Sequence, residues 1–411
     1  MHPRQHLPLL LAIAIAAAPS LAGDVKVTRF GRRLVVTNPS DQPRPNAIVT
    51  FPCRPLAALV PDLSGVEVSD GDVALPTQLD DLDADRVPDE IVLQVDLEPN
   101  QTRTLWLASL KPSESGFQPA KCAAARSNFR HVGYAALESR QAAYGLACSF
   151  PKGTPRPALQ LDPFGKRAEQ QGLCLASMDT APNAKPDSAL PTWLLPQRTA
   201  LGLGGPVIGG TPPVDGQTAT MFHRVLCDGP LRAGIQVDVL QWRTAGQGVY
   251  QARFQYFVYA GQEFVELRAS IQTIRPSDER LGIGMADLPQ VQARYADATL
   301  GYMGQWGQAA AGQPGVGQGV VFHPQDVVRL AAAPPSLAPG RIAYLQPKLS
   351  DRETHRWRVL LVADWEPGGR VAQATFVDRL ARLADELESP STTAPSRQAT
   401  EPPRSNPHSA P

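Results

Sequence analysis

Outside its first 22 residues the sequence lacks a long hydrophobic run, and it has no excess of charge of either sign. No later apolar run reaches about 18 residues, so we predict no transmembrane helix. The 39 basic and 39 acidic residues give a formal net charge of zero. The basic residues are scattered along the chain, whereas a nucleic-acid-binding protein gathers them on one face. The composition therefore predicts neither a membrane-spanning helix nor a nucleic-acid partner.

Cysteine is sparse and is poorly spaced for a metal site. No two of the five cysteines form a CxxC pair, which argues against a thiolate zinc site. An odd number leaves at least one thiol unpaired or intermolecular. Cys148 and Cys174 are candidates for a disulfide, and an equally good interpretation is that all five are small buried hydrophobic residues. The five are Cys53, Cys122, Cys148, Cys174 and Cys227.

A nucleotide-binding loop is missing as well. The stretch Gly202-Leu203-Gly204-Gly205 is followed by no Lys-Ser/Thr pair and has no strand-to-helix context. We interpret it as a glycine turn that lines a cleft, and we predict no organic cofactor.

The two ends of the chain have recognisable compositions. Residues 1–22 resemble a secretory signal, with Arg4, an apolar stretch at 7–18 and small residues before Gly23, so we expect cleavage after Ala22 and export to the periplasm or the exterior. Residues 389–411 are rich in Ser, Thr, Pro and Ala, and we expect them to be a disordered tail.

Between the ends, short alternating segments predict a mainly β protein. Residues 23–110 contain several short strand patterns separated by turn residues, and we expect a small β-sandwich module. Residues 111–127 are interpreted as a linker, and residues 128–388 as a larger β domain. Before the tail, Phe376, Leu380, Leu383 and Leu387 recur at steps of four, three and four, which predicts a helix that packs on the β domain.

The best hairpin pattern joins residues 250–259 to 263–274 through a turn at 260–262. One face is apolar, and we expect it to be core. The other face is mixed, and we expect it to be either solvated or a polar, aromatic groove. Its members are Arg253, Gln255, Phe257, Tyr259, Phe264, Glu266, Arg268 and Ser270.

A run of acidic residues lies in the expected N-terminal module. Asp81, Asp83, Asp85 and Asp89 have the i, i+2, i+4 and i+8 spacing of a calcium loop. Arg86 stands at the position of the loop glycine, and Val92 at that of the closing glutamate. The sequence therefore predicts either a structural calcium site with these four ligands or an acidic surface turn between two strands.

Several segments together resemble one family of exported bacterial proteins, the domain of unknown function 4861 family. The match covers nearly the whole chain after residue 22. The matching segments, in chain order, are VVTNP at 35–39, LPTQLDDLDAD at 75–85 with DE at 89–90, ALES at 136–139, AYG at 143–145, DPFGK at 162–166, LGLGG at 201–205, GPLRA at 229–233, YAG at 259–261 and ADWE at 363–366.

This resemblance implies a fold and a function. The fold it implies is a β-supersandwich like that of galactose mutarotases. The function is a role in the breakdown of uronic-acid polysaccharides, as a carbon–oxygen lyase or dehydratase that leaves a 4,5-unsaturated sugar. The chain departs from the family pattern at residues 178–187, which contain no histidine, at Leu137 in place of a tryptophan, and at Ser139 in place of an asparagine. If those residues serve catalysis, the activity is altered or lost.

Elimination next to a uronate carboxylate needs a cation or hydrogen-bond donor for the carboxylate, a base for the C5 proton and an acid for the departing oxygen. His131 is the preferred base, and Glu138 is a candidate because a carboxylate in an apolar strand needs a partner, which Arg140 could also supply. The remaining catalytic candidates are Tyr144, Lys166 and His223.

Each of these candidates also has an ordinary structural interpretation. A half-buried structural histidine is the default for His223, and a solvated turn lysine is as good an interpretation of Lys166. The substrate-binding candidates are Arg224, Arg253, Tyr259 and Trp306, although most tryptophans in a β domain belong to the core.

The sequence thus leaves two main hypotheses and one minor one. The first is an exported lyase or dehydratase that acts on uronate-containing oligosaccharides or polysaccharides. The second is a non-catalytic carbohydrate-binding or envelope protein that keeps the fold without the site. Epimerase or mutarotase chemistry is a third and rests on fold analogy alone.

Overall fold

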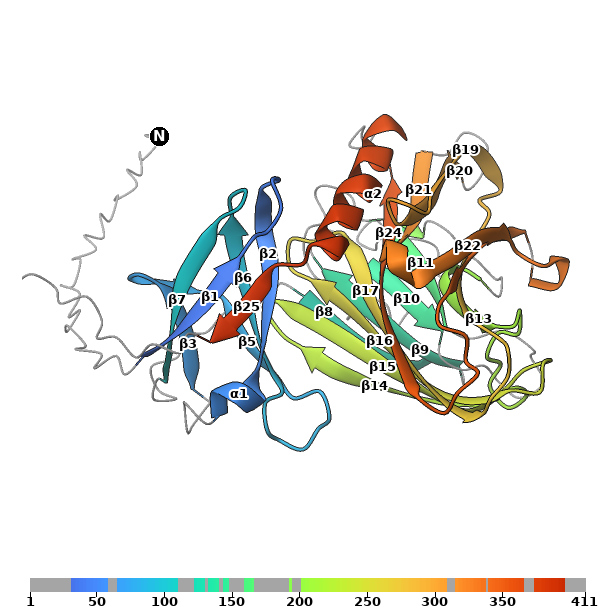
Figure 1. Ribbon diagram of the computed structural model, residues 1–411, viewed down its shortest axis with the longest axis horizontal. Helices are drawn as coiled ribbons and strands as arrows, with labels where there is room; N and C mark the ends of the chain where they lie inside the picture. The colour runs from blue at the N-terminus through green and yellow to red at the C-terminus, as the bar shows by residue number, and fades with distance from the viewer. Residues whose placement is uncertain are drawn as a thin grey trace, which may run out of the picture.

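The computed structural model describes residues 31–57, 65–109, 122–129, 132–139, 143–147, 159–165, 192–193, 201–308, 315–337, 339–365 and 373–395. Strands dominate these residues and form four antiparallel sheets (Figure 1). The α-helices within them are α1 (Cys53–Ala57) and α2 (Gln373–Glu388). The prediction of a mainly β protein with a C-terminal helix is confirmed. No helix in this part of the chain is long and apolar enough to cross a membrane.

The first seven strands and the last one form a small two-sheet sandwich, the N-terminal module (Figure 1). Its sheets have the strand orders β25-β1-β7-β3-β4 and β2-β6-β5, and its own core contains Leu34, Phe51, Ile91 and Leu107. The strands are β1 (Gly31–Thr37), β2 (Arg44–Pro52), β3 (Val66–Asp70), β4 (Val73–Leu75), β5 (Thr77–Asp80), β6 (Glu90–Leu97), β7 (Thr102–Ser109) and β25 (Thr392–Pro395).

The last strand of the module differs from expectation. Residues 389–411 were expected to be disordered, but Thr392–Pro395 pair with β1, with Thr392 opposite Thr37. The edge of β1 offers unpaired backbone groups, and a segment without large apolar residues can still bond to them. Arg44 also donates to the Ser389 carbonyl at 2.7 Å. Residues 396–411 lie outside the described residues.

A larger sandwich follows, made of two sheets. The first has the order β22-β23-β18-β13-β11-β10-β9-β8, with β12 paired to β11, and the second the order β14-β15-β16-β17-β24-β21-β20-β19. We call them the nine-stranded and the eight-stranded sheet. Because β8 begins at Cys122, the nine-stranded sheet starts inside the segment expected to be a linker.

The strands of the larger sandwich have the following bounds: β8 (Cys122–Phe129), β9 (Val132–Ser139), β10 (Ala143–Ala147), β11 (Gln160–Gly165), β12 (Thr192–Trp193), β13 (Leu203–Ile208), β14 (Thr220–Asp228), β15 (Arg232–Arg243), β16 (Val249–Tyr259), β17 (Phe264–Arg275), β18 (Leu281–Ala286), β19 (Gln290–Asp297), β20 (Tyr302–Gln308), β21 (Gly315–Phe322), β22 (Val327–Ala332), β23 (Gly340–Leu345) and β24 (Thr354–Trp365).

The main hydrophobic core lies between these two sheets. The predicted hairpin is present as β16 and β17, with Val258 opposite Val265. Its apolar face is buried in this core, as expected from alternation along each strand. The residues concerned are Tyr250, Ala252, Phe254, Tyr256, Val258, Val265, Leu267, Ala269 and Ile271. The mixed face of the hairpin therefore points outward.

Helix α2 packs on the outer face of the eight-stranded sheet, over β20, β21 and β24 (Figure 1). Its buried side chains include Phe376, Leu380, Leu383 and Leu387, which confirms the predicted helix. Glycines leave room for it: a Cβ on Gly317 would lie 2.7 Å from the Phe376 ring. The helix thereby covers the β20, β21 and β24 side of the outer face, and the N-terminal module contacts the β14–β17 side at the hairpin turn, Arg232 and Arg224.

Candidate functional site

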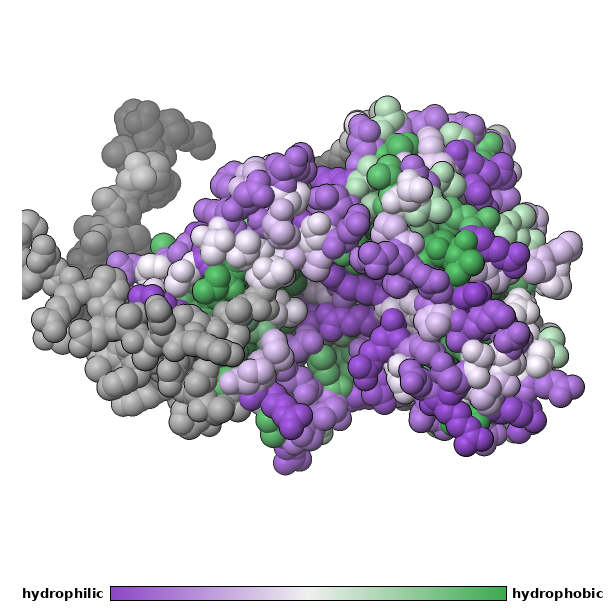
Figure 2. Space-filling view, viewed as in Figure 1, coloured by the Kyte–Doolittle hydropathy of each residue, from purple (hydrophilic) through white to green (hydrophobic). Residues whose placement is uncertain are grey.

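The N-terminal module contacts the outer face of the eight-stranded sheet near the turn of the β16–β17 hairpin. Gln94 Nε2 donates to the Ala260 carbonyl at 2.7 Å, and Gln262 Nε2 donates to the Asn46 carbonyl at 3.0 Å. Figure 2 shows a recessed hydrophilic area between the two lobes. The junction is therefore held by specific polar contacts and lines an open depression.

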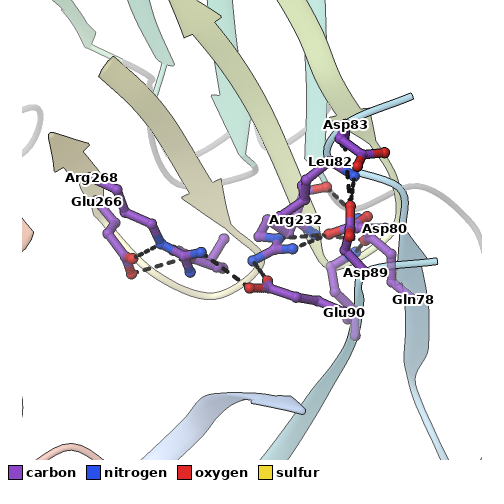
Figure 3. A network of polar contacts seen from close by, with 11 residues as sticks. Gln78, Asp80, Leu82, Asp83, Asp89, Glu90, Arg232, Glu266 and Arg268 are labelled. Carbon is purple, nitrogen blue, oxygen red and sulfur yellow. Dashed lines mark hydrogen bonds and ion pairs between the residues drawn. The ribbon is translucent and has the colours of Figure 1, made fainter. Parts of the chain in front are cut away.

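Six charged side chains cross this junction in a chain of alternating sign, which we call the charge ladder. Figure 3 shows its members from Asp80 to Glu266. Arg232 pairs with Asp80 and, at 2.7 Å, with Glu90. Glu90 lies 3.4 Å from Arg268, and Arg268 is 2.5 Å from Glu266. Glu266 finally lies 2.9 Å from Arg358. Asp80 and Glu90 come from the module and the other four from the sheet, so the ladder joins the two lobes. Its members are Asp80, Arg232, Glu90, Arg268, Glu266 and Arg358.

The inner end of the ladder is fully buried. Arg232 is 0% exposed and Asp80 is 2% exposed. The guanidinium carbons of Arg232 and Arg268 each lie over the Phe257 ring, 4.7 Å from its centroid. Gln78 accepts from the backbone N–H of Arg232 at 2.8 Å. Buried charges are tolerated when they are paired and hydrogen-bonded in this way.

The ladder also sets the protonation of its central members. Burial by itself would raise the pKa of Glu266, but Arg358 and Arg268 outweigh it and hold that pKa well below its usual range. Burial and the neighbouring Glu266 carboxylate raise the pKa of Tyr259. The Tyr259 hydroxyl donates to Glu266 at 3.0 Å. At neutral pH the pair is thus a carboxylate and a phenol.

A cavity of about 360 Å³ opens above the outer end of the ladder. Its floor is the mixed face of the hairpin with β24, and its walls are β2 and the C-terminal end of α2. The polar lining side chains include four arginines and three glutamates: Arg44, Arg268, Arg358, Arg382, Glu90, Glu266 and Glu386. Of the two expectations for the mixed face of the hairpin, the polar, aromatic groove is therefore the one found here, with Tyr259 and Phe264 in the lining.

The four predicted substrate-binding residues are separated by the fold. Tyr259 lines the cavity. Arg224 donates to the Leu82 carbonyl at 2.6 Å, and Arg253 is an exposed residue paired with Asp238 at 2.9 Å. Trp306 does not fit the prediction, because it is 3% exposed and its ring packs against Phe376 of α2.

The predicted catalytic residues are also not gathered in one place. Tyr144 lies opposite Leu137, and both are buried in the main core, whereas Glu138 lies opposite Ala143 and therefore faces the other side of the sheet. Glu138 is fully buried there. His223 is half-buried on β14, opposite the core residue Val237. His131 and Lys166 lie outside the described residues.

Two family segments of the nine-stranded sheet nevertheless reach the cavity rim. Ser139 donates to the Gln262 carbonyl at 3.4 Å, and Tyr144 donates to the Glu263 carbonyl at 3.3 Å. Gln262 itself lines the cavity. The ends of β9 and β10 are thus held against the hairpin turn that closes one side of the cavity.

In the acidic loop the structure selects three of the four predicted metal ligands. Oxygen atoms of Asp81, Asp83 and Asp89 lie within 4.8 Å of one another. Asp85 is not part of this group, and its carboxylate accepts from the Val87 N–H at 2.7 Å. Asp81, Asp83 and Asp89 also accept from backbone N–H groups of the loop, so position, and not hydrogen bonding, separates Asp85 from the group. The calcium site stays a prediction.

Backbone contacts shape this loop and its charges. Partial desolvation would raise the pKa of Asp81, but the N–H groups of Arg86, Ala84 and Asp85 lower it overall. For Asp83, the Asp85 N–H lowers the pKa, but desolvation and the neighbouring carboxylates outweigh it and raise the pKa overall. Asp89 accepts from the Leu82 N–H at 2.6 Å (Figure 3). The cluster is therefore preformed by the loop backbone.

The most strongly coupled residues of the junction were missed by sequence reasoning. Glu266 and Arg268 were placed on the mixed face of the hairpin without a role, and Arg232, Glu90 and Arg358 were not singled out. Two sequence signals could have found them: a charged residue at an alternate position of an otherwise apolar strand, and, for Glu90 and Arg232, their place in the family segments at 89–90 and 229–233.

The fold is that of a two-lobed β protein. Ion pairs fix its small β-sandwich to the larger one, and a cavity lined by charged residues lies at the junction. The chain belongs to the family described as "Domain of unknown function (DUF4861)", whose model matches residues 36–146 and 199–392. The resemblance inferred from the sequence segments is thereby confirmed.

Solved structures also resemble this chain. One is an α-mannosidase from Enterococcus faecalis V583, with a TM-score of 0.47 and 11% identity, covering 90% of this chain and 46% of the other. Another is a protein in glycosyl hydrolase family 38 from Enterococcus faecalis, with a TM-score of 0.44 and 12% identity, covering 89% of this chain and 47% of the other. The chain spans about half the length of each. No curated protein matches.

Proposed function

We propose that the protein is an exported carbohydrate-active lyase or dehydratase that acts on uronate-containing oligosaccharides. The observation that carries the proposal is the cavity at the junction, where arginines from both lobes and from α2 surround a space of about 360 Å³. A cavity of this size suits one or two sugar rings and not a polymer. The proposed export rests on residues 1–22, and a mature N-terminus at Gly23, found by mass spectrometry, tests it.

Arginines in the cavity could neutralise the uronate carboxylate, which is the first requirement of the elimination. Arg358 uses one Nη2 contact for Glu266 and is 46% exposed, so other N–H donors of its planar group remain for a sugar carboxylate. Arg382 faces the cavity from α2 and is 48% exposed. Neutralising the uronate carboxylate makes the neighbouring C5 proton more acidic, so that a base can remove it more easily.

The base and the acid are proposed to come from the family segments at the rim. Within the described lining, each carboxylate already accepts from an arginine, and the Tyr259 hydroxyl donates to Glu266. The predicted candidates that remain are His131 and Lys166, whose positions lie outside the described residues, because Glu138 is fully buried on the face of the nine-stranded sheet that points away from the cavity. This division gives binding to the cavity and proton transfer to its edge.

An absorbance assay tests the proposal. Uronate oligosaccharides incubated with the protein should develop the ultraviolet absorbance of a conjugated enol carboxylate. In Arg358→Gln the apparent KM should rise about tenfold, because a charge-assisted contact to the substrate is lost. Arg294→Gln is the control: Arg294 is an exposed arginine paired with Asp287, and it lies on β19 away from the cavity. An equal effect of both substitutions would contradict the assignment of the cavity.

The second candidate function is carbohydrate binding without catalysis. It is favoured by the commitment of every described cavity carboxylate to an arginine and by the absence of histidine from residues 178–187. Calorimetric binding of the oligosaccharides, with no absorbance change across several uronate classes, would establish this function in place of the first.

We further propose that the acidic loop binds calcium in a structural role. Its oxygen donors are those that calcium prefers, and Asp81, Asp83 and Asp89 would hold it. The loop lies against the sheet through the bond from Arg224 to the Leu82 carbonyl, so an ordered loop would support the junction.

Calcium should raise the melting temperature of the protein, because it binds the folded loop, and at 100 times its Kd it adds about 2.7 kcal/mol. Asp83→Asn should abolish this gain. Asp85→Asn is a matched control in the same loop, since Asp85 lies outside the cluster, and it should retain the gain. No heat of binding and no thermal shift in the wild type would end the proposal.

A further inference from the structure

We propose that the outer face of β14–β17 and β24 is a binding platform for an extended uronate chain, which enters the cavity by one end. This inference rests on the proposed function and names the form of its substrate: an oligosaccharide of several rings laid across the strands. Three observations carry it, namely the strand register, the charges and the position of the face between the loop and the cavity.

The register brings five polar residues into one row across five strands. Arg224 lies opposite Gln236, Gln236 opposite Gln255, Gln255 opposite Arg268, and Arg268 opposite Arg358. Directly opposed side chains on one face have Cβ atoms about 5 Å apart. Four strand spacings make the row about 19 Å long. Gln236 is 1% exposed, so a ligand would meet the row through Arg224, Gln255, Arg268 and Arg358. The row runs at right angles to the strands.

A second row runs beside the first, two residues further along each strand. It contains Phe222, Asp238, Arg253, Ser270 and Arg356, each opposite the next. Phe222 is 57% exposed, and the Arg253 side chain is 56% exposed. An exposed aromatic ring at the end of a polar strip can stack on the apolar face of a sugar. The two rows together form the platform.

The platform carries more positive than negative charge. It contains five arginines and one acid, Asp238, which forms an ion pair with Arg253. Arg268 and Arg358 share Glu266. Among the described residues no carboxylate pairs with Arg224 or Arg356, although Arg224 bonds to the Leu82 carbonyl. Arg224 and Arg356 could therefore bind an anionic ligand without first breaking an ion pair to a described carboxylate.

Gln255 of the first row adds hydrogen bonding that suits a hydroxyl group, and the buried Gln236 fixes its orientation. Gln255 Nε2 donates to Gln236 Oε1 at 3.0 Å, and Gln236 Nε2 donates to Asp238 at 2.7 Å. Arg253 donates to the same Asp238 carboxylate. These bonds fix the two amides side by side and orient the strip before a ligand arrives, which lowers the cost of binding. The first row thus has arginines at both ends and amides between them, which suits a chain of sugars that carries both carboxylates and hydroxyl groups.

The ends of the first row point to the direction of the chain. Arg224 lies under the acidic loop, through Leu82, whereas Arg268 and Arg358 belong to the cavity lining. The recessed hydrophilic area between the lobes in Figure 2 is the surface on which such a chain would lie. A terminal ring in the cavity would thus be continuous with further rings on the platform.

Oligogalacturonates of one, two and four rings, titrated calorimetrically into the full-length mature protein, test the platform. The affinity should rise with length. Arg224→Gln combined with Arg356→Gln should weaken the four-ring ligand about tenfold and leave the single ring unchanged. Arg243→Gln is the matched control, because Arg243 is an exposed β15 arginine at the far end of the strand. The single variant Arg356→Gln gives a separate readout if the double variant melts early.

The outcomes separate this inference from the proposed function. Binding that is independent of ligand length, or an equal loss for one and four rings, would overturn the platform and leave the cavity assignment intact. A wild type that binds no uronate of any length would overturn both. Tighter binding of single-stranded DNA or of a neutral glucan than of the uronate tetramer would assign the face to another ligand and also overturn the platform.

Discussion

Replacing Arg232 by methionine is expected to lower the free energy of unfolding by about 3–5 kcal/mol, because it leaves a buried carboxylate without its cation. Asp80 is 2% exposed and would keep one side-chain donor, the Gln78 amide at 2.6 Å. Glu90 would keep Arg268 at 3.4 Å. The loss should therefore come mainly from Asp80. Urea unfolding followed by both fluorescence and far-ultraviolet circular dichroism measures it.

Two control variants test whether the loss of stability comes from breaking a buried ion pair or from removing any arginine. Arg382→Met breaks the pair with Glu386, whose side chains are 48% and 23% exposed, and should cost less than about 1 kcal/mol. Arg232→Met combined with Asp80→Asn should recover part of the loss, since no unpaired charge remains. A double variant as unstable as Arg232→Met alone would show that packing around Phe257, and not charge pairing, holds the junction.

Replacing Glu266 by glutamine is expected to change how stability depends on pH. The folded-state pKa of Glu266 is depressed, since Arg358 and Arg268 outweigh its burial. A depressed pKa contributes stability that is fully present above the unfolded-state value of about 4.3 and is lost as the pH falls below it. In that acidic range the wild type should lose about 1.4 kcal/mol per pH unit through this group, and Glu266→Gln should lack this part of the slope.

At neutral pH the same substitution should be destabilising by about 3–5 kcal/mol, because two guanidinium groups lose their shared carboxylate. Glu386→Gln is the matched control, as Glu386 pairs with the exposed Arg382, and it should keep the wild-type slope. Unfolding free energies measured by urea titration at several pH values between about 3 and 7 give both quantities. A variant with the wild-type acid slope would remove Glu266 from the ladder's pH response.

Local sequence patterns were sufficient to predict those helices and strands whose buried face follows one hydrophobic periodicity. The steps of four, three and four in Phe376, Leu380, Leu383 and Leu387 predicted α2, and each of these side chains is buried in it. Alternation predicted the β16–β17 hairpin and both of its faces. These succeeded because a helix stripe or a strand face follows from the geometry of one segment.

The failures have a common physical origin in contacts between distant segments. Composition predicted disorder for residues 392–395, but the free edge of β1 binds them as β25. Trp306 was a binding candidate until α2 covered it. In each case the deciding partner lies elsewhere in the fold.

The sequence by itself determined the class of the protein: mainly β, with a C-terminal helix, of a recognisable family, and with a polar face on its best hairpin. The tertiary structure alone decided which charges meet. Asp80, Arg232, Glu266 and Arg358 are separated by up to hundreds of residues, and their pairing depends on strand order and register. A shift of one residue would turn each of them to the opposite face of its sheet. Ion pairs act over a few ångströms, so the charge ladder, the cavity and the platform exist only once that register is set.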